Sequence, residues 1–209
     1  MPAKALLLLL IALCLPAAAH AQEKQDALEL YKNGNYLRAI EICQQELKEV
    51  PNRMDAYAVL GWSLLKLKRY QEALDSTQKA LNISRYDPRI LEIMGEALYF
   101  LGKRQEALKY FEEYVAVAPT GGRIDLAYYY MGEIFILQGR YNHADIAFST
   151  ALYHSPNTAD WWARLGYVRE QAGDYQWSLE AYGKALALNP NLEDALRGKS
   201  RVEKRLSGG

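Results

Sequence analysis

A repeat with a period of about 34 residues constrains this chain more than any other feature of its sequence. Units can be drawn from His20, Met54, Pro88, Asp125 and Ala159, with a short insertion after the third unit. Their aligned columns hold glycine at Gly61, Gly95, Gly132 and Gly166, alanine at Ala39, Ala73, Ala107 and Ala144, and closing prolines at Pro51, Pro119, Pro156 and Pro190. A period of this length is typical of stacked helical hairpins.

Two sets of glycines explain how each unit folds. Gly61 and its equivalents fall in the middle of a predicted helix, where glycine costs about 1 kcal/mol relative to alanine. A repeated cost implies a repeated gain, and we expect it to be the close approach of a neighbouring helix backbone. A second set marks the turn between the two helices of each unit: Gly34, Gly102, Gly139 and Gly173. One hairpin is too small to bury its apolar face, so neighbouring units must stack.

The fifth unit carries the pattern most completely, with Trp162, Leu165, Gly166, Gly173, Tyr175, Ala185 and Pro190. At these columns the chain resembles the tetratricopeptide repeat family. The resemblance implies an all-α, right-handed α-solenoid of five helical hairpins over residues 22–53, 54–87, 88–121, 125–158 and 159–192. A polar C-terminal segment, 193–209, is predicted to form a helix that covers the last apolar edge. Lys68 stands where the second unit should have its turn glycine, and Tyr114 replaces a small residue late in the third unit.

The insertion lies within residues 118–125, which contain Thr120, Gly121 and Gly122. Such a cluster breaks helices. We expect a longer surface loop here, and the alternative is a hinge between two halves of the solenoid.

Residues 1–21 have the pattern of a secretory signal peptide. One lysine precedes a Leu/Ile/Ala run that ends in Ala19-His20-Ala21, which predicts cleavage after Ala21. The run is short for a membrane span, so we expect a soluble exported protein of the periplasm or cell envelope with no span after signal removal. A lipoprotein anchored through Cys14 is the alternative, although the bulky Leu13 argues against it. Cleavage leaves Cys43 as the remaining cysteine, which excludes an internal disulfide.

Charge and motifs argue against several functions. The chain has 25 basic and 25 acidic side chains, so it lacks the basic excess expected of a nucleic-acid-binding protein. It has no P-loop, dinucleotide fingerprint, H-E-x-x-H or C-x-x-C motif. We therefore predict no cofactor, no metal and no enzymatic activity. Glu92 and Glu96 lie four positions apart on one helix face, a spacing open to an acid/base pair, but an acidic patch facing a partner fits this pattern better.

The resemblance further implies that partners bind on a concave face lined by the first helix of each hairpin. Spacings of three and four positions place a set of side chains there: Trp62, Arg89, Glu92, Glu96, Tyr99, Tyr129, Glu133 and Tyr167. This aromatic and acidic groove suits an extended peptide or a helix that carries apolar side chains and a basic group. The alternative is a structural module whose solenoid self-associates into a homodimer or larger homo-oligomer.

Three consecutive tyrosines test this reasoning. Successive helical residues are rotated by about 100°, so Tyr128, Tyr129 and Tyr130 cannot form one platform. Tyr128 is predicted to lie in the core, Tyr129 to face the groove, and Tyr130 to point between units.

Overall fold

The computed structural model describes residues 26–208, and this part of the chain contains helices and no strands. The helices are α1 (Ala27–Lys32), α2 (Tyr36–Glu49), α3 (Met54–Lys66), α4 (Tyr70–Ile83), α5 (Pro88–Phe100), α6 (Arg104–Val117), α7 (Ile124–Leu137), α8 (Tyr141–His154), α9 (Ala159–Ala172), α10 (Tyr175–Leu188) and α11 (Glu193–Ser207). The predicted signal peptide and Cys14 lie outside the described residues. None of the described helices is long and apolar enough to cross a membrane.

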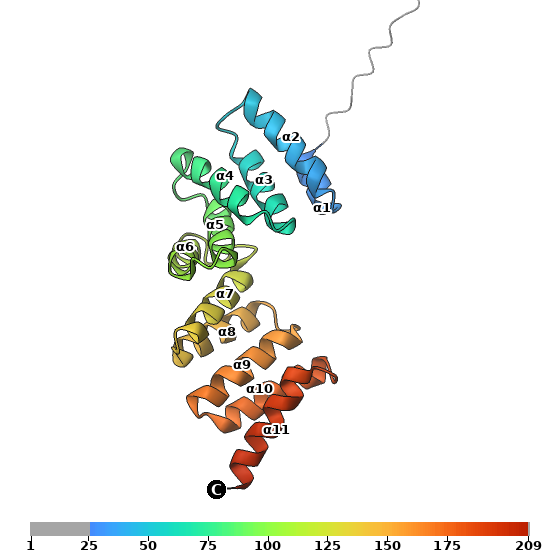
Figure 1. Cartoon of the computed structure of the whole chain (residues 1–209), viewed down its shortest axis with the longest axis vertical. Helices are drawn as coiled ribbons and strands as arrows, with labels where there is room; N and C mark the ends of the chain where they lie inside the picture. The colour runs from blue at the N-terminus through green and yellow to red at the C-terminus, as the bar shows by residue number, and fades with distance from the viewer. Residues whose placement is uncertain (1–25, 209) are drawn as a thin grey trace, which may run out of the picture.

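Consecutive helices pair into antiparallel hairpins that stack in chain order, from α1 and α2 at one end to α11 at the other (Figure 1). The molecule is therefore an elongated α-solenoid, as predicted. One main apolar core runs through the stack, and a smaller one lies between α9, α10 and α11. Cys43 is buried in the main core, and burial raises the pKa of its thiol to about 12.

The turns inside the hairpins follow the glycine pattern. Gly34, Gly102, Gly139 and Gly173 all have positive φ, between 68° and 88°. Lys68 occupies the equivalent place in the second hairpin and also has positive φ, at 59°. Lysine adopts this left-handed conformation at a cost, because its Cβ crowds the following carbonyl oxygen.

The mid-helix glycines have a different role from the one predicted. A Cβ added to Gly95 would lie 2.6 Å from the ring of Phe111. A Cβ added to Gly132 would likewise collide with the ring of Phe148, and one added to Gly166 with the ring of Tyr182. Each glycine therefore makes room for an aromatic ring on the second helix of the same hairpin, rather than for a neighbouring backbone.

The second hairpin lacks such a ring. Thr77 stands in the equivalent position, and a Cβ on Gly61 would instead lie 2.9 Å from Ile93 of the next hairpin. The space beside Gly61 is thus filled from outside the hairpin.

The insertion lies at a junction where α6 and α7 contact each other less extensively than the helices of most other successive pairs do. Tyr114, near the end of α6, is buried there, and a Cβ on Gly121 would collide with its hydroxyl. Ala80, Ala151 and Ala185 occupy the equivalent buried positions in other hairpins. The longer connection therefore accommodates a tyrosine where these units have alanine.

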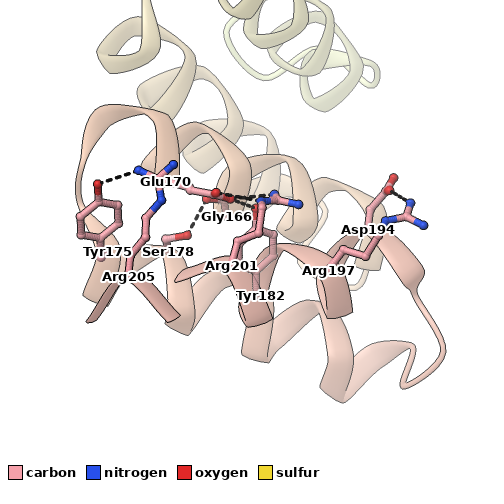
Figure 2. Close-up of polar contacts among 9 residues, drawn as sticks. All are labelled: Gly166, Glu170, Tyr175, Ser178, Tyr182, Asp194, Arg197, Arg201 and Arg205. Atoms are coloured by element: carbon pink, nitrogen blue, oxygen red, sulfur yellow. Dashed lines mark hydrogen bonds and ion pairs between the residues drawn. The ribbon is translucent and has the colours of Figure 1, made fainter. Parts of the chain in front are cut away.

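The helix α11 covers the last hairpin through few apolar side chains and a central ion pair. Ala195, Gly198 and Val202 are its buried residues. Arg201 donates to both carboxylate oxygens of Glu170 on α9, from Nε at 2.9 Å and from Nη2 at 2.8 Å (Figure 2). The hydroxyl of Tyr182 on α10 donates to the same carboxylate at 3.0 Å.

This arrangement controls the ionisation of Glu170. Burial acts to raise the pKa of its carboxyl, but the hydrogen bonds from Arg201 and Tyr182 outweigh burial and hold the pKa below its ordinary value. Gly198 permits the contact, because a Cβ there would collide with the Tyr182 ring.

Candidate functional site

The eight predicted groove residues all lie on odd-numbered helices: Trp62 on α3, Arg89, Glu92, Glu96 and Tyr99 on α5, Tyr129 and Glu133 on α7, and Tyr167 on α9. We call the surface formed by α1, α3, α5, α7, α9 and α11 the odd-helix face. The structure divides the predicted residues on this face between two clefts and an aromatic bridge.

The first cleft has a volume of about 370 Å³ and lies between α1, α3, α5 and the insertion. Three rings border it: Tyr31, Trp62 and Tyr114. Pro88, Ala118, Gly121 and Gly122 complete its apolar wall, with Arg89, Glu92 and Arg123 as its charged members. The rings of Tyr31 and Trp62 lie 6.0 Å apart, so two neighbouring hairpins contribute to one aromatic surface.

Glu92 is held below the surface of this cleft. It is 2% exposed, and it accepts a hydrogen bond from Trp62 Nε1 at 3.1 Å and another from Arg123 Nε at 2.7 Å. Arg123 also pairs with Glu96, from Nη2 at 2.5 Å. Burial raises the pKa of Glu92 and outweighs the opposing charge of Arg123.

Arg123 belongs to the insertion, directly before α7. Its backbone N–H donates to the Tyr114 hydroxyl at 3.3 Å. The insertion is therefore more than the surface loop we expected, because it brings a guanidinium into the odd-helix face.

Arg89 stands at the edge of the first cleft between two aspartates. Its guanidinium pairs with Asp87 at 2.7 Å and with Asp55 of the preceding hairpin at 2.6 Å. Asp87 also caps α5, since it accepts a hydrogen bond from the backbone of Arg89 at 3.0 Å.

An aromatic bridge links α5, which borders the first cleft, to α7, which borders the second. The ring of Tyr99 lies 4.8 Å from that of Tyr130, which lies 5.5 Å from Tyr129. Tyr130 also stacks on Phe111 at 5.6 Å, so it points between units as predicted. Tyr128, which was predicted to be core, is only half-buried. Its column lies at the edge of the core, where Trp162 is also half-buried.

The second cleft, of about 520 Å³, lies between α7, α9 and α11. Tyr129 and Tyr167 line it together with Arg164 and Arg201. Tyr129 stacks on Trp161 at 4.9 Å, and burial raises the pKa of its hydroxyl to about 12. Tyr129 thus borders this cleft.

Arginine residues pair with the acids of the odd-helix face. Glu133 pairs bidentately with Arg164, at 2.5 and 2.7 Å. In four pairs the carboxylate comes from one unit and the arginine follows it later in the chain: Asp55–Arg89, Glu92–Arg123, Glu133–Arg164 and Glu170–Arg201. The acids that we predicted to face a basic partner are therefore engaged within the chain.

Sequence reasoning missed Arg123, Arg164 and Arg201. The sequence does contain a signal for these arginines. Each follows its glutamate partner by 31 residues, in the pairs Glu92–Arg123, Glu133–Arg164 and Glu170–Arg201. Within the described residues there is no cluster of histidine, cysteine, aspartate and glutamate that would hold a metal ion.

Family models match three segments of the chain. Tetratricopeptide repeat models match residues 88–120 and 159–192, and a model of the anaphase-promoting complex, cyclosome, subunit 3 matches residues 12–80. The third and fifth of the repeats identified from the sequence are therefore tetratricopeptide repeats. Folds of this class are typically non-enzymatic scaffolds that bind protein or peptide partners.

Similar proteins extend the comparison. The chain is 25% identical over 171 residues to BBSome complex member BBS4 of Bos taurus, covering 82% of this chain and 32% of that protein. It is 26% identical over 156 residues to anaphase-promoting complex subunit 7 of Arabidopsis thaliana, covering 73% and 27%. The chain thus spans about a third or less of the length of these relatives.

Solved structures share the fold at lower identity. The type IV pilus biogenesis factor PilW has a TM-score of 0.68 at 22% identity, covering 88% of this chain and 90% of that one. YrrB, described as a tetratricopeptide repeat protein with an unusual peptide-binding site, has a TM-score of 0.67 at 22% identity, with 83% and 88% covered. MamA has a TM-score of 0.67 at 19% identity, with 79% and 95% covered.

Proposed function

We propose that this chain is an exported adaptor or assembly factor that binds a peptide or helix of a protein partner along the odd-helix face. The observation that carries the proposal is the first cleft, where the rings of Tyr31, Trp62 and Tyr114 border a concavity of about 370 Å³. Concave sites with apolar walls and a few fixed polar groups are where proteins commonly bind ligands. Aromatic side chains also dominate binding energy at interfaces.

The second cleft extends the proposed binding surface. Tyr129 and Tyr167 lie there, two and three hairpins beyond Trp62 along the solenoid. An extended segment that crosses the aromatic bridge would contact both clefts. Export rests on the pattern of residues 1–21.

Capture of partners from a cell-envelope extract tests the site. The double variant Trp62→Ala/Tyr129→Ala is expected to lose partners that the unaltered chain retains. Ile146→Ala is the control, because Ile146 is 67% exposed on α8, an even-numbered helix, and lines neither cleft of the odd-helix face. Circular dichroism confirms that each variant is folded. Equal capture by the double variant and the unaltered chain would refute binding on the odd-helix face.

Export has a separate test. Amino-terminal sequencing of the chain recovered from the cell envelope is expected to begin at Gln22. Recovery of the chain in the cytoplasmic fraction with residues 1–21 intact would contradict export.

Self-association is a second candidate, and exposed aromatics on the even-numbered helices favour it. Tyr153 and Trp177 are 82% and 62% exposed and border one cleft between α8 and α10. Neighbouring exposed aromatics mark interaction surfaces. Sedimentation of the purified chain tests this candidate: a dimer that Trp177→Ala dissociates supports it, and a monomer at high concentration rules it out.

A further inference from the structure

The insertion gives the first cleft a wall of its own, and we call the space between this wall and the rings of Tyr31 and Trp62 the insertion pocket. Building on the proposed function, we infer that the insertion pocket receives an apolar side chain of the partner segment, and that basic residues flank that side chain. Three features carry this inference: how the pocket is built, which polar groups are already bonded, and where charge accumulates.

The insertion and Tyr114 build the pocket together. Tyr114 stands where three other units have alanine, and Gly121 leaves room for its hydroxyl. The backbone of Gly121 and Gly122 then forms one wall, and the rings of Tyr31 and Trp62 form another. A junction without the extra residues would have no such wall.

The indole of Trp62 and the charged groups beside it bond to one another. Trp62 Nε1 donates to Glu92, and Arg123 donates to Glu92 and Glu96. A polar ligand group would have to break these bonds or lose its hydration without compensation, and both cost free energy. An apolar side chain gains from leaving water and disturbs no bond. The pocket therefore favours an aliphatic or aromatic anchor.

The charge around the pocket determines which residues of the partner segment fit beside its apolar anchor. Two guanidinium groups, of Arg89 and Arg123, face four carboxylates, of Asp55, Asp87, Glu92 and Glu96. The pocket lining itself holds Arg89, Glu92 and Arg123, and counting their ion-pair partners gives more acidic than basic side chains. Asp55, just outside the lining, is the most solvent-accessible of these acids, with its side chain 76% exposed. Complementarity therefore favours lysine or arginine beside the anchor and disfavours acidic segments.

Selection from a random phage-displayed dodecapeptide library on the purified protein tests the inference. Enriched peptides are expected to share an aliphatic or aromatic residue next to lysine or arginine. Fluorescence anisotropy then measures the Kd of one labelled representative. Replacing its anchor by aspartate, or its basic residue by glutamate, is expected to raise the Kd by about tenfold or more.

Variants of the protein locate the binding. Gly122→Leu is expected to raise the Kd about tenfold by occupying the pocket, since Gly122 lies in its wall and a Cβ there meets no atom within 4 Å. Gly183→Leu is the matched control, because its Cβ also meets no atom within 4 Å and it lies on α10, outside the pocket. Tyr31→Ala, which removes another wall, is expected to weaken binding as well.

The failures are distinguishable. Enrichment of no peptide would overturn the proposed peptide binding and this inference with it. Enriched peptides without an apolar anchor, or peptides that bind Gly122→Leu and Tyr31→Ala as tightly as the unaltered protein, would overturn the inference alone. A loss of that binding in Tyr167→Ala would then place the peptide in the second cleft.

Discussion

Removing the guanidinium of Arg201 should release the C-terminal helix from the solenoid. The helix α11 buries only Ala195, Gly198 and Val202, so apolar contacts alone hold it weakly. Its main polar hold on the preceding hairpin is the pair with Glu170, which is 3% exposed. An exposed hydrogen bond from Arg205 to the Tyr175 hydroxyl, at 3.1 Å, adds little to it (Figure 2). Substitution Arg201→Met keeps an apolar stem and removes both donors to Glu170.

The magnitude follows from the bonds lost. Glu170 would keep the hydrogen bond from Tyr182 and lose two from Arg201. A hydrogen bond to a charged group contributes about 1.5–3 kcal/mol. The Arg201 side chain is 49% exposed, so solvent screening keeps the combined loss below the sum of two such bonds. We expect α11 docking to weaken by about 2–3 kcal/mol, which corresponds to about 30- to 150-fold.

Amide hydrogen exchange measures this change directly. Protection of the α11 amides should fall by that factor, while α3 and α5 keep theirs, because local opening precedes global unfolding. Arg197→Met is the control. Arg197 pairs with Glu193 and Asp194 of its own helix and is 61% exposed, so solvent screens these pairs and its loss should leave α11 docking almost unchanged.

Two results would refute the reasoning. Unchanged α11 protection in Arg201→Met would show that the pair does not hold the helix. An equal effect of Arg197→Met would show that helix propensity, rather than docking, controls exchange. In the double variant Glu170→Met/Arg201→Met, part of the loss should be recovered, because no uncompensated buried charge remains.

Three further predictions concern stability. Lys68→Gly should raise the free energy of unfolding in urea by about 0.5–1 kcal/mol, since Lys68 has φ 59°, a backbone conformation that favours glycine. A destabilised variant would show that the backbone at Lys68 is not strained. Gly95→Ala should destabilise the chain by about 1–3 kcal/mol in the same assay, since the new Cβ would lie 2.6 Å from the ring of Phe111. A variant as stable as the unaltered chain would show that the Phe111 ring can move away without cost. Because the pKa of Glu92 is raised in the folded state, its protonated form favours folding, so its contribution falls as pH rises from about 4.5 to about 7. Glu92→Gln should flatten that dependence, and an unchanged slope would assign it to other groups.

The repeat made the fold readable from the sequence. Helical hairpins depend on short-range signals, such as the turn glycines Gly34 and Gly173, and five copies of one pattern reinforce each other. Rotation along a helix also predicted different surroundings for Tyr129 and Tyr130, because side-chain direction within one helix is a local property. Tyr129 stacks on Trp161 and Tyr130 on Phe111, although the two tyrosine rings also contact each other at 5.5 Å.

Only the tertiary structure decided which side chains meet across units. Glu92 and Arg123 are 31 residues apart, and their contact depends on the path of the insertion, which no local pattern specifies. The same holds for Gly95 and Phe111, because ring packing depends on how two helices cross. The sequence by itself therefore determined the helices, their order and the face that Trp62 occupies. The stacking of units decided that the acids of that face are paired, because ion pairing requires a distance of a few ångströms between residues that the chain alone leaves far apart.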